Sequence, residues 1–475
     1  MIQPSRRALA VILVALAAGR TCAAVAAPLP PRLEQVLHSQ GVPASAVSIV
    51  VRDVVTGETY LELNGREPRS PASTIKVLTT FATLEQLGPS YHWTTRAYGT
   101  GPVVDGRLAG DLVIEGGGDP YLNAERWWRF ARELRNTGLK RIDGDIVIDR
   151  SLYALQEPEP DEFDGRGERV YNVPPDALLV NFQAAEFHFV PEPSRVRVIV
   201  DPEPANLRLG NALRVAGGPC VSGAGAVTFT TYQDDPDRVT LSGRLSSRCA
   251  PWVVRRAIMH APDYAFGTFV TYWREQGGEF AGRLRLEAKP AAARPLAEYE
   301  SLSVGEVLQL LNKHSNNTMA RMLLLTLGLE RFGAPATVAN GERALAEWLA
   351  RKGLDFPELV TDNGSGLSRR TRISADSLAR LLAVAYRSRY YPELAASLPL
   401  GGQDGTLRRR FVDLAAEGRI RLKTGHLDGV SAVAGWVTSR AERPLAVVVI
   451  VNRAGAEFGG GDAVIDTVVR WALDR

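Results

Sequence analysis

A long middle part of the chain, from about residue 96 to residue 294, is rich in predicted strands, and between about residues 169 and 250 apolar and polar residues alternate in almost every segment. Examples are Glu186–Val190, Arg195–Val200 and Val239–Ser242. Alternation with a period of two indicates strands with one buried face. The parts on either side carry longer helical patterns, and 475 residues exceed what one hydrophobic core normally holds. The chain must therefore fold as several units, with a β-rich region in the middle.

The two ends of the chain predict a second sheet. Near the start, residues 46–53 and 58–63 predict two strands joined at Thr56 and Gly57. Near the end, three further apolar segments predict strands of an antiparallel sheet: residues 420–423, 431–437 and 445–451. A final amphipathic helix, residues 462–473, is expected to pack on this sheet, and residues up to about 398 are rich in helical patterns.

The first half of the middle region predicts a mixture of strands and one helix. Residues 108–115 and 142–149 predict short strands with glycine turns. Between them, residues 124–136 place Trp127, Phe130 and Leu134 on one side of an amphipathic helix.

The first residues of the chain resemble an export signal. Arg6 and Arg7 precede an alanine- and leucine-rich run over residues 8–18, and a small-residue cleavage site follows at residues 24–26. No other stretch is long enough to span a bilayer. We expect residues 1–26 to be removed and the protein to lie in the periplasm, with at most peripheral membrane contact.

Charge and cysteine usage exclude several classes of protein. The net charge of +3 is too balanced for a nucleic-acid binder. Without the signal, Cys220 and Cys249 remain, and two cysteines in an exported protein are expected to form a disulfide. No histidine cluster accompanies them, so neither a metal nor another cofactor is expected. The sequence gives no indication of oligomeric state.

A candidate nucleophile lies between the first pair of strands and an apolar run. Ser73 is expected to open a buried helix, and Lys76, three residues later, returns to the same face and can reach the serine hydroxyl. A serine whose proton is taken by a neighbouring amine is an activated nucleophile. The alternative is a helix-capping serine beside a solvated lysine. The chain has six lysines among 56 basic residues, which makes a chance occurrence of this spacing less frequent.

Two later motifs supply the other groups that acyl transfer needs. Ser315 and Asn317 begin an amphipathic stretch, and Lys423-Thr424-Gly425 ends the first closing strand. Ser315 can pass the proton to the leaving amine, and Asn317 can hold Lys76 and a substrate amide.

The strand that ends in Lys423-Thr424-Gly425 is expected to bind the substrate and to lower the pKa of the base. Lys423 and Thr424 would attract a substrate carboxylate, and the charge of Lys423 would lower the pKa of Lys76. The backbone N–H groups of Ser73 and His426 are candidates for an oxyanion hole.

Together the three motifs resemble those of penicillin-binding serine acyl-transferases. The wider match is to the D-alanyl-D-alanine carboxypeptidase/endopeptidase family, the class C low-molecular-mass penicillin-binding proteins. That family carries a long insertion between the first two motifs, as this chain does between Lys76 and Ser315. Residues 116–120, 362–369 and 402–407 are also similar to family signatures, so the resemblance covers the whole mature chain.

One residue departs from the family pattern. A small hydroxyl residue is common directly after Lys-Thr-Gly, whereas this chain has His426. One interpretation places the imidazole beside the substrate carboxylate, where it adds a cationic contact when protonated. The other directs the ring to solvent and leaves only its backbone N–H in use.

The resemblance implies a multi-domain α/β (α+β) protein. Residues 27–95 and 295–475 would form a discontinuous transpeptidase/β-lactamase-like domain, with an antiparallel sheet flanked by helices. Residues 96–294 would form the β-rich insertion, as two modules: residues 96–165 with 255–294, and residues 166–254.

The resemblance also implies a function. The expected activity is serine-type D-Ala-D-Ala carboxypeptidase and DD-endopeptidase action on peptidoglycan stem peptides, through an acyl-enzyme on Ser73 that β-lactams would also form. The alternatives are a β-lactamase or esterase-like serine hydrolase, and a non-catalytic penicillin-binding wall sensor.

Overall fold

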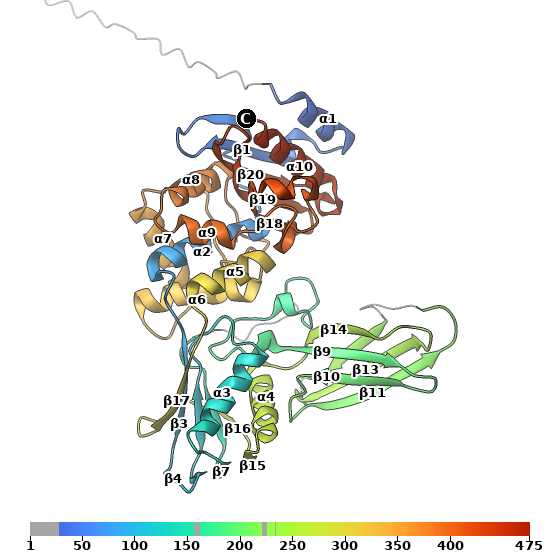
Figure 1. Cartoon of the computed structure of the whole chain (residues 1–475), viewed down its shortest axis with the longest axis vertical. Coiled ribbons are helices and arrows are strands. Elements are labelled where there is room, and N and C mark those ends of the chain that lie inside the picture. The colour runs from blue at the N-terminus through green and yellow to red at the C-terminus, as the bar shows by residue number, and fades with distance from the viewer. Residues whose placement is uncertain (1–27, 156–161, 221–225, 233) are drawn as a thin grey trace, which may run out of the picture.

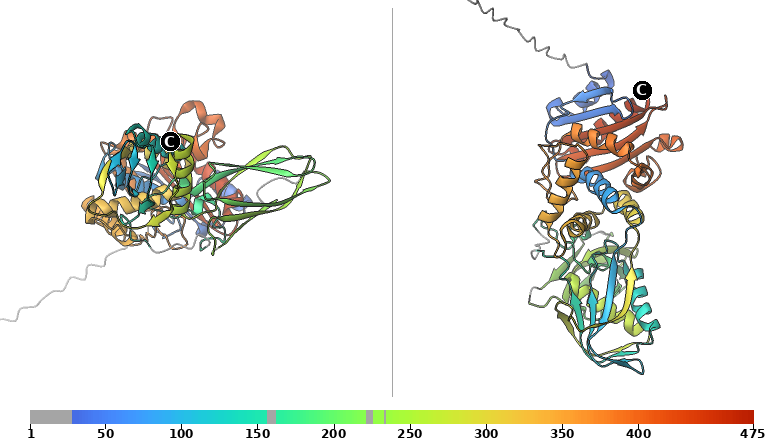
Figure 2. Two further views of the ribbon diagram at one scale, coloured as in Figure 1. Left: turned by 90° about the horizontal axis from the view of Figure 1, so that it is seen from below. Right: turned by 90° about the vertical axis from the view of Figure 1, so that its left-hand side faces the viewer.

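The computed structural model describes residues 28–475 apart from residues 156–161, 221–225 and 233. The segment predicted as a signal peptide lies outside the described residues. Figure 1 shows two bodies stacked along the long axis and a narrow β module that projects sideways from the lower one. The right-hand view of Figure 2 shows the same separation between the upper and lower bodies, and the left-hand view, from below, shows the β module projecting to one side.

The upper body contains a five-stranded antiparallel sheet in the order β18-β19-β20-β1-β2. Its strands are β1 (Val47–Asp53), β2 (Thr59–Leu63), β18 (Ile420–Leu427), β19 (Val430–Thr438) and β20 (Pro444–Asn452). The two ends of the chain thus share one sheet, with β1 paired directly to β20. This agrees with the strands predicted at both ends.

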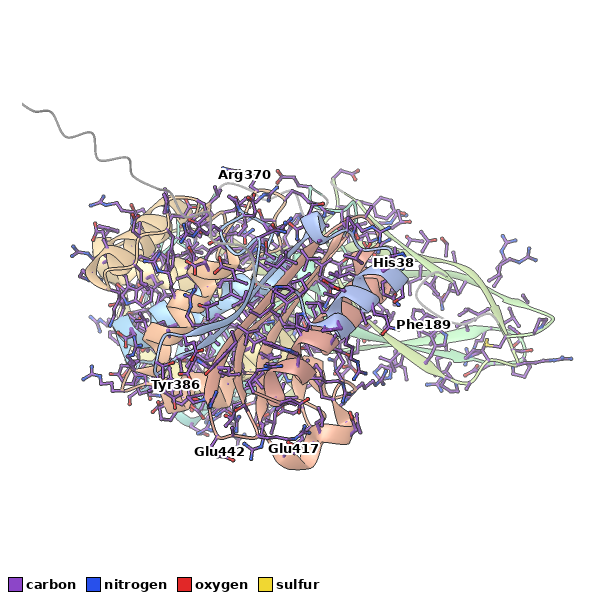
Figure 3. The ribbon with its side chains drawn as sticks, turned by 90° about the horizontal axis from the view of Figure 1, so that it is seen from above. His38, Phe189, Arg370, Tyr386, Glu417 and Glu442 are labelled. Atoms are coloured by element: carbon purple, nitrogen blue, oxygen red, sulfur yellow. A yellow bond between two sulfur atoms is a disulfide. The ribbon has the colours of Figure 1, made fainter. Side chains whose placement is uncertain are left out.

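Helices cover both faces of this sheet, which is why its central strands are apolar at nearly every position. Val447 and Val449 of β20 pack with α1 (Pro31–Ser39) and α10 (Gly460–Leu473). Figure 3 shows His38 of α1 on this side of the sheet. Val448 and Ile450 face the other way, into a core shared with the remaining helices. These are α2 (Lys76–Leu87), α5 (Val304–His314), α6 (Asn317–Phe332), α7 (Val338–Arg351), α8 (Ala375–Tyr386) and α9 (Tyr391–Ser397).

The lower body is organised around a mixed five-stranded sheet in the order β16-β8-β6-β3-β17. Its strands are β3 (Thr94–Gly99), β6 (Leu112–Glu115), β8 (Ile146–Asp149), β16 (Leu284–Leu286) and β17 (Arg294–Glu300). Helices α3 (Ala124–Asn136) and α4 (Ala261–Glu275) contribute aromatic side chains to its core. A small second sheet holds β4 (Val103–Val104), β5 (Arg107–Leu108), β7 (Arg141–Ile142) and β15 (Glu279–Phe280).

The strands predicted over residues 108–115 and 142–149 are each divided in two. The first becomes β5 and β6, and the second becomes β7 and β8. At the breaks the chain folds tightly on itself: Gly144 N–H donates to Gly110 O, and a Cβ on Gly144 would lie 2.6 Å from that oxygen. The glycines therefore end one pairing and start another, so each segment serves two sheets.

The projecting module consists of two three-stranded sheets. One has the order β10-β9-β14 and the other β11-β13-β12. The strands are β9 (Ala184–Pro191), β10 (Val196–Asp201), β11 (Arg208–Ala216), β12 (Val227–Thr231), β13 (Arg238–Ser246) and β14 (Trp252–Ala257). Phe187 stands edge-on to Phe229 at 4.9 Å between the sheets, and Phe189, labelled in Figure 3, also contacts Phe229. The predicted disulfide between Cys220 and Cys249 is confirmed.

The middle region is attached to the upper body next to α6. A small core joins Tyr153 and Val173 of the middle region to Met322 and Leu325 of that helix. The predicted domain limits at residues 95 and 295 fall inside β3 and β17, and the division into domains stays a prediction. In the described part of the chain, no helix has the length and apolarity needed to cross a membrane.

Candidate active site

Ser73 lies in a tight turn that leads into the buried helix α2. The turn is a 3-10 segment, Ala72–Ile75, and α2 starts only at Lys76, so Ser73 does not open the α-helix itself as predicted. Ala72 has a positive φ of 45°, which is sparsely populated for a residue with a side chain. Of residues 71–80 only Ser73 is not buried. The turn thus presents one hydroxyl at the edge of a closed core.

The amine of Lys76 lies against that hydroxyl. Lys76 is fully buried, and its Nζ is 2.8 Å from Ser73 Oγ, 2.7 Å from Asn317 Oδ1 and 2.5 Å from the carbonyl oxygen of Ser365. A neutral amine donates two hydrogen bonds and accepts one. It can therefore donate to the two carbonyl-type oxygens and accept the proton of Ser73.

The surroundings of Lys76 favour that neutral form. Burial lowers its pKa well below the ordinary range, and the positive charges of Lys423 and Arg321 lower it further. None of its three hydrogen-bond partners is a carboxylate. A lysine in such a place can act as a general base near neutral pH.

Ser315 and Asn317 occupy the junction between α5 and α6. Ser315 ends α5 in a left-handed conformation, with φ 57° and ψ 37°, which turns the chain sharply into α6. Asn316 caps α6 by accepting a hydrogen bond from Met319 N–H. Asn317 donates through Nδ2 to the carbonyl of Tyr171 at 3.1 Å, which directs its Oδ1 toward Lys76.

Lys423 completes the group from the edge strand β18. It is fully buried, and its Nζ donates to Ser315 Oγ at 2.7 Å and to the carbonyl of Thr424 at 2.8 Å. Burial lowers the pKa of Lys423 to about 7. The hydroxyl of Thr424 donates to the hydroxyl of Thr406 at 2.7 Å. All three predicted motifs therefore meet at one place.

Gly425 allows β18 to lie directly beside the Ser73 turn. A Cβ at this position would be 2.7 Å from the carbonyl oxygen of Pro71 and 3.0 Å from the backbone nitrogen of Ser73. On the same strand, Leu422 N–H donates away from β19, to Pro399 O. Because N–H directions alternate along an antiparallel strand, His426 N–H also points away from β19. Both backbone donors predicted for an oxyanion hole thus lie at this edge.

The side chain of His426 is 40% exposed and contacts two polar groups. Its Nε2 lies 3.0 Å from Asp462 Oδ1 and 3.3 Å from Ser431 Oγ. Burial opposes ionisation of Asp462, but hydrogen bonds from His426 and Ser431 and the charge of Arg410 lower its pKa to about 2. The imidazole is thus engaged at the start of α10.

Several residues of the site were not predicted from the sequence. Ser365 contributes a backbone carbonyl to Lys76, and Gly366 lets its loop approach the turn, because a Cβ there would lie 2.0 Å from Ala72 O. Thr406 and the carbonyl of Tyr171 were also missed. The loops of Ser365 and Thr406 belong to the segments 362–369 and 402–407, which resemble family signatures. In the described part of the chain no group of three or more His, Cys, Asp or Glu residues could hold a metal ion.

Comparison with known structures defines the class of this fold. Penicillin binding protein 4 of Haemophilus influenzae superposes with a TM-score of 0.78 at 22% identity, covering 93% of this chain and 99% of that chain. A predatory endopeptidase of Bdellovibrio bacteriovorus, acylated by penicillin G, gives a TM-score of 0.54 at 16% identity, covering 90% of this chain and 93% of that one. The chain has the fold of penicillin-binding proteins, which confirms the predicted fold class.

The family follows from the sequence comparisons. The model of the D-Ala-D-Ala carboxypeptidase 3 (S13) family matches residues 29–473. A D-alanyl-D-alanine carboxypeptidase of Actinomadura sp. (strain R39) is 31% identical over 434 residues, which are 88% of this chain and 80% of that protein. The chain belongs to the S13 family of D-Ala-D-Ala carboxypeptidases, and the resemblance based on the three motifs is confirmed.

Proposed function

We propose that this protein cleaves D-alanyl bonds in peptidoglycan stem peptides through an acyl-enzyme on Ser73. The observation that carries the proposal is the position of Lys76 Nζ, 2.8 Å from Ser73 Oγ and supported by Asn317 and the Ser365 carbonyl. Lys76 accepts the proton of Ser73 as the serine oxygen attacks the carbonyl carbon next to the terminal D-alanine. The N–H groups of Ser73 and His426 stabilise the oxyanion.

The leaving amine needs a proton when the tetrahedral intermediate collapses. Ser315 is suited to transfer it, since its hydroxyl is hydrogen-bonded to Lys423. Water then hydrolyses the acyl-enzyme with the same groups acting in reverse.

Lys423 and Thr424 bind the carboxylate of the departing residue. A charged lysine without a carboxylate among its hydrogen-bond acceptors is available to pair with an anion. Among the residues that the structure describes, Nζ of Lys423 donates to a hydroxyl and a carbonyl oxygen. In a carboxypeptidase reaction this carboxylate belongs to the terminal D-alanine. In an endopeptidase reaction the leaving amine belongs to a cross-linked partner peptide, and the same acyl-enzyme forms.

We propose that the protein performs both reactions and does so in the periplasm after removal of residues 1–26. We also propose that β-lactams acylate Ser73, as strained analogues of the D-alanyl amide. The penicillin-acylated Bdellovibrio endopeptidase supports this, since it shares the fold.

Product analysis tests the two activities. The mature protein is incubated with a purified pentapeptide muropeptide and with a D-alanyl cross-linked dimer, and the products are separated by liquid chromatography and identified by mass. Release of one D-alanine from the first substrate and conversion of the second to monomers are expected. Ser73→Ala should yield neither product. Conversion by Ser73→Ala at the wild-type rate would contradict the proposal.

A further inference from the structure

Arg321 is a residue whose charge lowers the pKa of Lys76 but to which the mechanism above assigns no role. It lies on α6 one helical turn after Asn317, the first residue of that helix. Residues four apart occupy the same face of a helix, so Arg321 follows directly behind the amide that holds Lys76. A cationic residue therefore lies one helical turn from the amide that holds the base.

The loop that contacts Lys76 crosses α6 at the turn that carries Arg321. A Cβ on Gly364 would lie 3.4 Å from Ala320 O and 3.1 Å from Leu324 Cβ. The next residue of the loop, Ser365, accepts the hydrogen bond from Lys76 Nζ. The turn of α6 that carries Arg321 is thus packed against the loop that holds Lys76.

The positive charge of the Arg321 guanidinium group is only partly neutralised by its neighbours. Nε of Arg321 is buried and has no hydrogen-bond partner among the residues that the structure describes. Burial lowers the pKa of Arg321, and the charge of Asp362 acts in the opposite direction. Asp362 is shared with Arg370, whose Nη1 lies 3.4 Å from its Oδ1. An arginine remains charged even when its pKa is lowered, so a positive charge persists beside the site.

We propose that Arg321 is a positioning residue for the general base, whose partly compensated positive charge keeps the amine of Lys76 free of a proton. This inference rests on the proposed acyl-enzyme mechanism. When Ser73 attacks, its O–H bond breaks and the proton goes to the lone pair of Lys76 Nζ. The serine oxygen forms the new bond to the carbonyl carbon. A Lys76 that is already protonated cannot take part.

Other charges around Lys76 act together with Arg321. Lys423 approaches from β18 and also lowers the pKa of Lys76. Burial raises the pKa of Glu342 on α7, and the charge of Asp362 raises it further. The charge of Asp362 therefore offsets part of the charge of Arg321, and Asp362 is itself shared with Arg370.

The pH profile of acylation tests this role. The second-order rate constant for acylation by a fluorescent penicillin is measured between about pH 5 and pH 9 for wild type, Arg321→Gln, Arg321→Lys and Asp362→Asn. Arg331→Gln is the matched control, since Arg331 is exposed near the other end of the same helix. The rate should rise with pH as Lys76 loses its proton.

Arg321→Gln and Asp362→Asn, which each remove a charge, should shift the pH at which the acylation rate rises in opposite directions. Loss of the positive charge in Arg321→Gln raises the pKa of Lys76. The acid limb, the part of the profile in which the rate rises with pH, should therefore move to higher pH by about one unit, which lowers the rate on the acid side about tenfold. Rates should converge with wild type at high pH. Loss of the negative charge in Asp362→Asn shifts the limb downward. Arg321→Lys and Arg331→Gln should follow wild type.

The possible results separate this inference from the proposed function. If Arg321→Gln is slower by one factor at every pH, or if both variants shift in the same direction, Arg321 has only a structural role. If Arg321→Gln does not fold, as judged by circular dichroism, the downward shift of Asp362→Asn decides, and its absence overturns the inference. If wild type is not acylated on Ser73, the proposed function fails first.

Discussion

Asn317 lies between Lys76 and the inserted region: its Oδ1 accepts from Lys76 Nζ at 2.7 Å, while its Nδ2 donates to the carbonyl of Tyr171 at 3.1 Å. Thr318 makes a second bond to the same segment, to Val173 O at 2.8 Å. The middle region of the chain, far from the catalytic motifs in sequence, therefore holds a side chain of the site. The insertion therefore helps to hold Lys76 in place, through Asn317.

Substitution of Asn317 should separate the positioning of Lys76 from its charge. Asn317→Ala removes one hydrogen-bond acceptor of a buried amine and should slow penicillin acylation at all pH values, by about tenfold to a hundredfold. Asn317→Asp places a negative charge 2.7 Å from Nζ in the wild-type geometry and raises the pKa of Lys76. Its acid limb should therefore move to higher pH. Identical pH profiles for the two variants, in stopped-flow acylation, would contradict the role of Asn317 beside the base.

Binding of the substrate carboxylate should weaken as Lys423 loses its proton. The pKa of Lys423 is lowered to about 7 by burial, so the free enzyme carries the charged form below this pH and the neutral form above it. We expect kcat/KM for a D-Ala-D-Ala peptide to fall by up to about tenfold per pH unit above that value, mainly through KM. The measurement is steady-state D-alanine release between about pH 6 and pH 9. In Lys423→Met, KM should be high and independent of pH, and a wild-type KM that is flat over this range would exclude the charge contact.

The imidazole of His426 should have little influence on substrate binding. Because Nε2 is held 3.0 Å from Asp462, His426→Thr should have a pH profile of KM parallel to that of wild type. A wild-type KM that rises with pH while that of the variant stays flat would instead place the ring beside the substrate.

The same variant should show a pH-dependent loss of stability. His426 is among the groups that lower the pKa of Asp462 to about 2. A carboxylate with a lowered pKa stabilises the fold above its usual pKa of about 4 and loses that effect as the pH falls toward 2. The variant should therefore melt below wild type at pH 7, and the difference should shrink in acid. Thermal unfolding followed by circular dichroism measures both values.

Much of this arrangement could be predicted from local sequence patterns. The helix over residues 124–136 was predicted with its observed limits, since its apolar residues recur at helical spacing. The three closing strands were each found, though β18 continues through His426 to Leu427. Strand periodicity also explains the direction in which the side chain of His426 points. It is three residues from Lys423, and side chains three apart on a strand point to opposite faces.

The rest depends on contacts that local patterns cannot show. Ser365 acts through its carbonyl, 289 positions from Lys76, and a backbone oxygen has no signature in the residue type. Arg321 follows the second motif within an otherwise helical stretch, where a single arginine is commonly a surface residue. The loop around Gly364, which packs on the same turn of α6, is placed there only by the tertiary fold.

Removal of the disulfide should affect the projecting module and leave the chemistry intact. Cys220 and Cys249 are 29 positions apart, and closing a loop of this length contributes about 3–4 kcal/mol in the chain-entropy model. The double variant Cys220→Ser/Cys249→Ser should unfold at lower denaturant concentration than wild type under non-reducing conditions. Acylation by penicillin should remain at the wild-type rate. Equal unfolding midpoints for the two proteins would show that the bond does not stabilise the module.

The central claim is that Ser73 is the nucleophile, and mass spectrometry of the penicillin adduct tests it most directly. The mature protein is incubated with benzylpenicillin, denatured and digested with trypsin. We predict one penicilloyl group, on the peptide Ser70–Lys76 that trypsin releases between Arg69 and Val77. Ser73→Ala should carry no adduct. An adduct on any other peptide, or one that persists in Ser73→Ala, would contradict the account.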